Sequence, residues 1–434
     1  ARTLFIVSSK SGSTMEPELL RTYFFDLVKQ AVGAEEAGRR FIAVTDPCSD
    51  LEKVARADGF GHVFAGDPEI GGRYSVLSPF GMVPAAAIGV DVPAFFAATR
   101  PMVVSCGGDV PPAANPGLRL GAIIGEATVA RRNKMTVLAS ERLKPIGAWL
   151  EQLLAESTGK QNKGVIPVDL EPAGDPGAYG DDRLFVHLKL KGDDDRELEA
   201  RVVALEAAGQ PVVRIVLADP GLIGQEFFRW EIATAMAGSI IGIDPFNQPD
   251  VEASKVKTRL LVDAYERTGW VDPRQPVLRE GQLSFFAFRG ASDATALLKS
   301  LFDELTPRGY LGFLAYVERN DAHEAALSAM RTAVRDARRV ATVAGFGPRF
   351  LHSTGQAYKG GPAGGVFIEI TRTAEPDLAI PGHRASFGTV QIAQAIGDLD
   401  VLAERRRGWL RIHIEGDVDD GLATIGRLVA AALA

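Results

Sequence analysis

The segment Leu4-Phe-Ile-Val-Ser-Ser-Lys-Ser-Gly-Ser-Thr14 changes from apolar to hydroxyl-rich within a few residues. Its first part, residues 4–7, predicts a buried strand, and helix-compatible sequence follows the Ser/Thr/Gly stretch. A strand that opens through such a turn into a helix N-terminus builds an anion site, because backbone N–H groups converge there. Together with the hydroxyl groups and the Lys10 ammonium, this segment predicts a phosphate-binding loop.

The loop lacks the residue order of a Walker A motif, so we expect a small phosphate ester there rather than a nucleotide. The alternative is a polar turn that only caps the helix. A net charge of −7 argues against a nucleic-acid partner. No uncharged apolar run is long enough to span a bilayer and no signal peptide is present, so no membrane partner is expected.

The size and cysteine content of the chain limit its class. Its 434 residues suit two or three domains, and 46% hydrophobic residues are typical of a globular protein. Cys48 and Cys106 form no disulfide framework or metal-ligand cluster, which favours a reducing compartment and a cytoplasmic location. We interpret Cys106 as structural, because no activating pattern accompanies it.

Short apolar strands alternate with helices along the chain, which predicts α/β layers with a largely parallel sheet. The predicted strands of the first two-thirds are residues 4–7, 41–45, 102–105, 135–139, 184–190 and 212–217. The predicted helices between them include residues 17–32, 143–155 and 195–208. Residues 223–243 predict a further, buried helix. Two similar halves, 1–140 and 141–270, follow from this order, with a ligand cleft expected between them.

A third unit, 271–434, follows a linker predicted at Trp270–Gly281. Its predicted strands are residues 283–288, 310–317, 366–371 and 409–415. Ser292 is the expected N-cap of one helix, and Asp321 with Glu324 forms a capping-box pattern before another. The basic cluster at residues 405–407 is interpreted as a solvated helix end.

Two motifs offer cations or carboxylates to a ligand. In Gly71-Gly-Arg-Tyr-Ser75, the glycines Gly71 and Gly72 allow close backbone approach, and Arg73 presents a fixed cation. The alternative is a purely structural glycine turn whose arginine forms a salt bridge. In Glu156-Ser-Thr-Gly-Lys160, the carboxylate at a helix end beside a glycine turn could act as a general base, although such a residue is usually only solvated.

Two later motifs complete the set. Gln248 and Lys255 are seven residues apart, about two helical turns, so both can face one cleft if the segment is helical. His352 lies in a Ser/Thr/Gly stretch, where a histidine is expected to be more exposed and more available for proton transfer than on a strand. The other five histidines fit structural or connecting positions better.

In this order the motifs resemble phosphoglucose isomerase. The resemblance runs from about residue 4 to residue 257, and Gly71–Gly81 and Gly238–Lys255 are its most specific parts. Asp250 departs from the family pattern, which usually has a small residue there. The implied fold is α/β, with two sugar isomerase (SIS)-type doubly wound parallel-sheet domains at 1–140 and 141–270 and a C-terminal α/β (α+β) unit at 271–434.

The resemblance also implies residue roles. The sugar phosphate is held by Ser9, Lys10, Ser11, Ser13, Thr14, Gly72 and Gln248. Glu156 is the base that moves a proton between C1 and C2 through a cis-enediol, and Arg73 stabilises the enediolate. Lys255 and a histidine assist ring opening. Short-chain bacterial members carry Leu-His-Ser-x-Gly-Gln, which occurs here at Leu351–Gln356, so we infer that His352 returns to the cleft.

The resemblance implies the interconversion of glucose 6-phosphate and fructose 6-phosphate, with no cofactor and no metal. An alternative is a sugar-phosphate-binding SIS module without catalysis. The last third resembles the C-terminal unit of bacterial transaldolase/phosphoglucose isomerase fusion enzymes. We therefore expect a truncated fragment with an upstream transaldolase domain in the parent chain, inactive if its cleft is incomplete. A homo-oligomer is compatible with the family.

Overall fold

The computed structural model describes residues 3–269 and 274–434, apart from the side chains at 251 and 252. The chain divides into two compact units. Unit 1 comprises residues 1–116, 221–231 and 378–386, and unit 2 comprises the remaining segments, 117–220, 232–377 and 387–434. The three domain ranges expected from the sequence stay a prediction.

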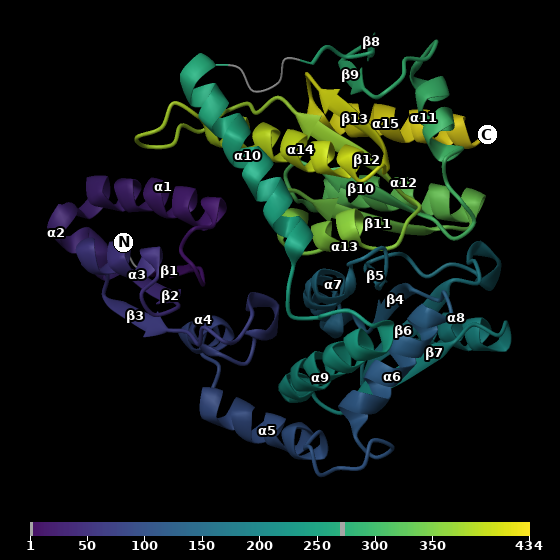
Figure 1. The fold of residues 1–434 in the computed structure, drawn as a ribbon, viewed down its shortest axis with the longest axis horizontal. Helices are drawn as coiled ribbons and strands as arrows, with labels where there is room; N and C mark the ends of the chain where they lie inside the picture. The colour runs from purple at the N-terminus through teal and green to yellow at the C-terminus, as the bar shows by residue number, and fades with distance from the viewer. Residues whose placement is uncertain (1–2, 270–273) are drawn as a thin grey trace. The chain divides into compact units, whose positions relative to one another are not determined.

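Unit 1 contains a three-stranded parallel sheet in the order β1-β2-β3, formed by Phe5–Ser8, Phe41–Thr45 and His62–Ala65. Its helices are α1 (Met15–Val32), α2 (Ala34–Ala37), α3 (Asp50–Ala57), α4 (Pro79–Ala87) and α5 (Val92–Ser105) (Figure 1). The core of this sheet is aromatic, with the rings of Phe5 and Phe41 stacked at 4.7 Å between centroids. The predicted strands at 4–7 and 41–45 are confirmed.

The strand predicted at 102–105 is wrong, because these residues form the last turn of α5. Asp91 caps this helix by accepting a hydrogen bond from the Ala94 N–H, and a proline at the first turn suits the helix start. Val103 and Val104 are 41% and 64% exposed, so the apolar run is not a core strand. A short apolar run cannot by itself distinguish strand from helix.

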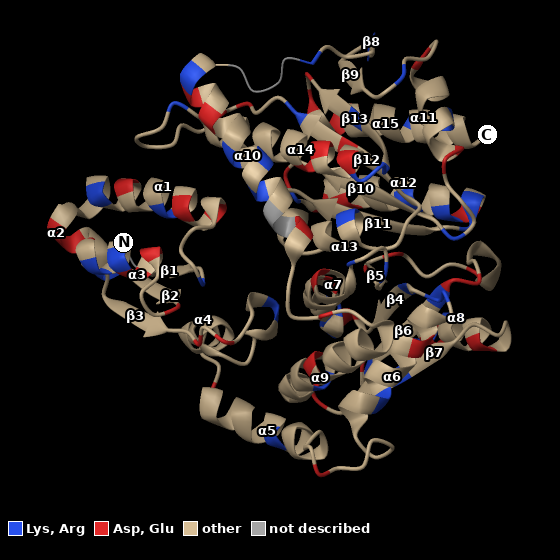
Figure 2. Ribbon diagram, in the orientation of Figure 1, with Lys and Arg blue, Asp and Glu red and all other residues tan. Residues whose placement is uncertain are grey.

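Unit 2 begins with a four-stranded parallel sheet in the order β5-β4-β6-β7. These strands are Ile166–Val168, Lys134–Ala139, Arg183–Leu190 and Val212–Leu217. The helices around it in the chain are α6 (Pro116–Val129), α7 (Pro145–Thr158), α8 (Arg196–Ala207) and α9 (Ile223–Ile241), of which residues 223–231 are assigned to unit 1. The predicted strands and helices of this region are confirmed within a few residues. The charged residues of α9 lie toward its start, and the rest of the helix is uncharged (Figure 2).

The second sheet of unit 2 has six strands in the order β11-β10-β12-β13-β9-β8. The first four, Ala341–Phe346, Tyr310–Ala315, Gly365–Arg372 and Gly408–Ile414, run parallel, whereas β9 (Leu283–Phe286) and β8 (Leu278–Glu280) are antiparallel. Its helices are α10 (Pro249–Thr268), α11 (Ala294–Phe302), α12 (Asp321–Arg338), α13 (Gly355–Gly360), α14 (Phe387–Glu404) and α15 (Val418–Leu433).

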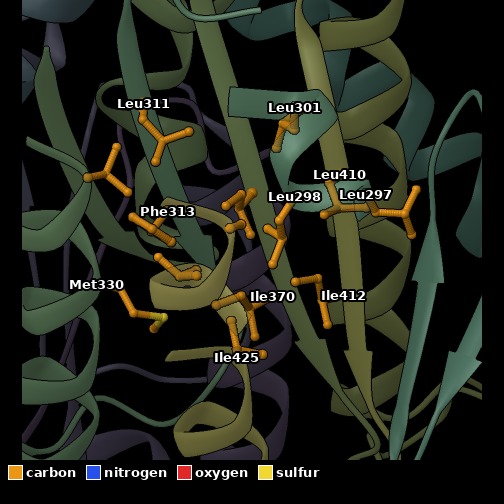
Figure 3. Packing of buried hydrophobic residues seen from close by; sticks show 14 of the residues in the cluster. Leu297, Leu298, Leu301, Leu311, Phe313, Met330, Ile370, Leu410, Ile412 and Ile425 are labelled. Carbon is orange, nitrogen blue, oxygen red and sulfur yellow. The ribbon is translucent and has the colours of Figure 1, made fainter. Parts of the chain in front are cut away.

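Alternation along β10 separates two cores. Leu311 and Phe313 pack with α11, α12 and α15 on one face, where Leu298, Met330 and Ile425 meet them (Figure 3). Tyr310 and Leu314 point to the other face and pack with α13 and α14. The sheet is therefore covered on both faces, as a doubly wound arrangement requires.

Three local expectations need correction. The N-cap of α11 is Asp293, whose side chain accepts from the Ala296 N–H at 2.8 Å, and not Ser292, which donates to that carboxylate. The N-cap of α12 is Asn320, one residue before Asp321. Of the linker predicted at 270–281, residues 270–273 lie outside the described part, and 278–280 form β8.

The two sheets of unit 2 are tied together by buried charges. Arg183 on β6 pairs with Glu171 at 3.1 Å, and both side chains are fully buried. The Glu171 carboxylate also accepts from Thr342 on β11. Burial of such a pair needs further hydrogen bonds to be tolerated, and Arg183 supplies one by donating to the Val340 carbonyl. Within the described residues, no helix is long and apolar enough to cross a membrane.

Candidate active site

The predicted phosphate loop of unit 1 is preorganised by its own hydroxyl groups. It follows β1 and ends at Thr14, the N-cap of α1. The hydroxyls of Ser11 and Ser13 lie 2.8 Å apart, and Ser9 Oγ accepts from the Gly12 N–H. The loop thus presents hydroxyl groups beside a helix N-terminus, which is the arrangement that favours an anion.

Gly12 allows the tight path of this loop. Its φ is +73°, and a Cβ added there would lie 2.3 Å from the backbone nitrogen of Leu51. Only glycine therefore fits without moving α3. The hydroxyl groups of the loop depend on this close approach for their positions.

Lys10 is fixed at the same end of the sheet. Its ammonium lies 2.8 Å from Asp46 Oδ1 and donates to the Asp67 carbonyl, also at 2.8 Å. Gly72 lies close to it, because a Cβ on Gly72 would contact the Lys10 side chain at 4.0 Å. Unit 1 thus brings the phosphate loop and the Gly-Gly-Arg motif together.

Arg73 lies in a single helical turn, η2 (Gly72–Tyr74), and is 4% exposed. Its guanidinium lies 5.5 Å from the centre of the Tyr74 ring. The turn is held by the Ser75 hydroxyl, which donates to the Gly72 carbonyl at 2.6 Å. A buried, fixed guanidinium is suited to stabilising negative charge on a ligand.

In unit 2, Glu156 lies in the last turn of α7, two residues before its end. Its neighbours Ala155, Ser157 and Thr158 are fully buried, whereas Glu156 itself is half-buried. Gln152, one helical turn earlier, donates to Glu156 Oε2 at 3.3 Å. The side chain thus projects from a rigid helix end and keeps access to a ligand, as a general base requires.

The Gln248–Lys255 motif opens α10. Gln248 is the N-cap position and is exposed, and Lys255 is half-buried in the second turn. The segment from Pro249 to Lys255 is helical, which is the condition under which Gln248 and Lys255 can face one cleft. His352 ends a short turn, η6 (Arg349–His352), and is half-buried between Leu351 and Ser353, which are both buried. His352 is therefore more exposed than His187, the histidine on β6, which is 1% exposed.

The side chain of Gln356 on α13 connects this helix to the end of α7 and to the start of α10. Its Nε2 donates to the Gly159 carbonyl at 2.8 Å and to Asp250 Oδ2 at 2.7 Å, while its Oε1 accepts from the Asp250 N–H at 2.8 Å. Gly159 follows Glu156 by three residues, Asp250 precedes Lys255 by five, and Gln356 follows His352 by four. One buried side chain therefore connects the segments that carry all three candidate catalytic residues of unit 2.

Close backbone packing supports the same junction. A Cβ on Gly159 would lie 2.3 Å from the Cα of Ala357, so α7 and α13 meet without side chains between them. α10 packs against both α13 and η6. The Asn162 N–H also donates to the Gly360 carbonyl at 2.9 Å.

Sequence reasoning missed two arginines at this junction. Arg405 pairs with Asp250 Oδ1 at 2.5 Å. Arg407 is 6% exposed and donates to the carbonyls of Tyr358, Lys359 and Gly361. The cluster at 405–407 is therefore not merely a solvated helix end. Among the described residues, no group of three or more His, Cys, Asp or Glu side chains is placed to hold a metal ion.

The sequence matches curated glucose-6-phosphate isomerases. That of Lactobacillus helveticus is 31% identical over 290 residues, which are 57% of this chain and 64% of the relative. That of Parabacteroides distasonis is 30% identical over 300 residues, covering 60% of this chain and 67% of the relative. The chain belongs to the glucose-6-phosphate isomerase family. It spans about two thirds of the length of these relatives, and no family model matches it.

Solved structures agree on the fold. A hypothetical protein from Thermus thermophilus aligns with a TM-score of 0.55 and 27% identity, covering 60% of this chain and 71% of that one. A glucose-6-phosphate isomerase from Chlamydia trachomatis aligns with a TM-score of 0.52 and 21% identity, covering 61% of this chain and 60% of that one. The predicted fold class, parallel-sheet α/β of the sugar isomerase type, is confirmed.

Membership of the glucose-6-phosphate isomerase family makes the distribution of the candidate residues informative. The phosphate loop, Gly72 and Arg73 belong to unit 1, whereas Glu156, Gln248, Lys255 and His352 belong to unit 2. In unit 1 Gly72 lies next to Lys10 of the phosphate loop, and in unit 2 Gln356 connects segments that carry the candidate residues. Asp250, the departure from the family pattern, is held by Gln356 and Arg405.

Proposed function

We propose that this chain carries the site of an aldose–ketose isomerase that interconverts glucose 6-phosphate and fructose 6-phosphate. The observation that carries the proposal is the Gln356 junction, which holds the segments of Glu156, Lys255 and His352 together in unit 2. Family membership supports the same reaction.

In this proposal the hydroxyl-rich loop Ser9–Thr14 binds the sugar phosphate, with Gln248 at the phosphate end of the site. Lys255 and His352 transfer protons at the ring oxygen and O1 and so open the ring. Glu156 then removes the proton from C2 of the aldose and returns it to C1, through a cis-enediol. The buried Arg73 guanidinium stabilises the enediolate charge. The proton moves between two carbons, so the isomerisation consumes no cofactor.

Substitution of Glu156 tests the proposal. Glu156→Gln keeps the shape of the side chain but removes the base, so turnover is expected to fall by about 10²–10⁴-fold. Binding of the substrate analogue 6-phosphogluconate is expected to persist, measured as a rise in Tm. Isomerase activity of the unaltered chain is the reference, and Glu126→Gln on the exposed face of α6 is the control. Wild-type turnover in Glu156→Gln would refute its role as the base.

A second candidate function is sugar-phosphate binding without catalysis. It is favoured by one observation, that the chain spans only about two thirds of its relatives. Binding of 6-phosphogluconate with no isomerase activity in the unaltered chain would support this alternative. The upstream transaldolase domain, the homo-oligomer and the cytoplasmic location stay predictions from the sequence.

A further inference from the structure

Unit 2 contains a cavity of about 630 Å³ at the carboxyl ends of β10 and β11. One wall is formed by the middle of α7 and the segment after β5, with Ala148, Glu151, Asp169 and Leu170. The other wall is formed by α12 and by residues 344–350, which comprise the end of β11 and the turn after it. Its size is that of a pocket for a small metabolite.

The position of the cavity in the sheet is the position where such sheets bind ligands. The strand order β11-β10-β12-β13 means that the chain leaves β10 to one side for β11 and then crosses to the other side for β12. In open parallel sheets, ligands bind beyond the carboxyl ends of the strands where the winding reverses. The cavity includes Val317, two residues after the end of β10.

A cluster of buried charges lies against this cavity. Arg331 is 2% exposed and donates to the Asp169 carbonyl at 2.8 Å, and Asp169 is 8% exposed. The Glu151 side chain is 12% exposed and lies 3.5 Å from the Arg349 guanidinium. The proposed isomerase mechanism uses none of these four residues.

The pKa values of the Glu151 and Asp169 carboxyl groups lie close to neutral pH. Burial and the neighbouring Asp169 raise the pKa of Glu151 to about 7, against the pull of Arg349 and Arg331. Burial raises the pKa of Asp169 to about 6, although Arg331, Arg349 and Arg319 oppose the shift. Near neutral pH the pair therefore offers both a proton donor and an acceptor to a ligand.

The remaining lining defines the chemistry of an occupant. Arg319 and Arg349 are 58% and 49% exposed and provide positive charge at the accessible part of the cavity. Their present partners include Glu324 and Glu151. Hydroxyl groups suit the carboxyl pair because they donate and accept, and an anionic group suits two guanidinium groups.

We propose that this cavity is a second ligand site, which binds a small polyhydroxylated anion such as a sugar acid or a sugar phosphate. The site does not depend on the isomerase activity. α7 carries both Glu151 of the cavity and Glu156 of the candidate active site, and η6 carries both Arg349 and His352. A ligand in the cavity would therefore contact two of the elements that position the candidate active site.

Isothermal titration calorimetry on the whole chain tests the proposal with three probes: gluconate, sorbitol 6-phosphate and sorbitol. We expect one or both of the anions to bind, and sorbitol to bind at least about tenfold more weakly, because it lacks the charge. Binding of gluconate alone would identify a sugar-acid site, and binding of both anions a site that accepts either group. Equal affinity for sorbitol, or no binding of either anion, would overturn the proposal.

Paired variants assign the binding to the cavity. The double variant Arg319→Ala/Arg349→Ala changes two partly exposed side chains and is expected to weaken anion binding about tenfold or more. Lys10→Ala in the phosphate loop is expected to leave this binding event unchanged while removing any binding at the candidate active site. Loss of binding in Lys10→Ala alone would overturn the cavity assignment. Far-ultraviolet circular dichroism verifies that each variant folds.

Glu151→Gln gives a test that keeps both arginines. It abolishes ionisation at one carboxyl group, so anion binding should change little below about pH 6 and should persist better than in the wild type as the pH rises through about 7. The titratable and charged groups that face this carboxyl are Asp169, Arg331, Arg349 and the buried Tyr358 of α13. An identical pH profile in the wild type and Glu151→Gln would show that the carboxyl pair does not contact the ligand.

Discussion

Gln356 and Asp250 hold each other through two hydrogen bonds, one to the backbone N–H and one to the carboxylate of Asp250. The pairing bridges 106 residues of sequence, and the bond from Gln356 to Gly159 bridges 197. The amide of Gln356 is fully buried, so each of these bonds is made where water does not replace it easily. These buried hydrogen bonds therefore fix α7, α10 and α13 to one another in a specific way.

Removal of the Gln356 hydrogen bonds should lower the stability of the protein. Gln356→Ala leaves the Asp250 carboxylate and the Gly159 carbonyl without one of their donors, so we expect the free energy of unfolding to fall by about 2–4 kcal/mol. Urea denaturation measures the change. Asp250→Ala combined with Gln356→Ala should cost less than the sum of the two single substitutions, because the two residues interact directly. Additive effects would show that the pair does not act as one unit.

A matched pair of glycine substitutions tests the phosphate loop. Gly12 and Gly33 both have positive φ, +73° and +89°, but only Gly12 meets the backbone of Leu51 if a Cβ is added. Gly33→Ala should cost about 1–3 kcal/mol from the strained backbone alone, because φ +89° with ψ 158° is a conformation that almost only glycine adopts. Gly12→Ala should cost clearly more and should abolish the rise in Tm with 6-phosphogluconate. Equal stability of the two variants would contradict the close contact between the loop and α3.

Much of the fold could be predicted because local sequence patterns indicate the individual strands and helices. Most strands of the three sheets are apolar runs bounded by turn residues, whereas β8, with the sequence Leu-Arg-Glu, gives no such signal and was not predicted. Alternation within β10 follows directly from the side-chain period of two. The strand predicted at 102–105 was wrong because the signal for a helix lay upstream, at the Asp91 cap, and outweighed the three apolar residues Met102, Val103 and Val104. The N-cap expected at Ser292 failed by one residue, since Asp293 offers the stronger acceptor.

The candidate residues were found from the order of motifs, but the contacts that position them were not. The partners of Gln356 lie more than 100 residues away in the sequence, and the carbonyls that Arg407 binds precede it by 46–49 residues. Such bonds have no periodicity to detect. The only local signals were the unusual Asp250 and the motif that ends in Gln356, and neither says which groups they meet.

We expect Glu231 to make the stability of unit 1 depend on pH. It lines a cavity with Tyr74, Phe96 and Phe228, and its Oε1 has no hydrogen-bond partner among the described residues. Burial raises its pKa from 4.5 to about 8. Between these values the folded state holds a proton that the unfolded state releases, so the free energy of unfolding falls as the pH rises.

Glu231→Gln should remove this dependence, since a glutamine stays neutral and keeps a similar shape. We expect the variant and the wild type to have similar stability at about pH 5, and the variant to be more stable by about 1–3 kcal/mol at about pH 8.5, beyond the raised pKa of the carboxyl group. Thermal unfolding across this range measures the difference, with Glu126→Gln on the exposed face of α6 as the control. A difference that does not grow with pH would mean that Glu231 is ionised in the folded protein, and hence that water or a cation reaches the cavity.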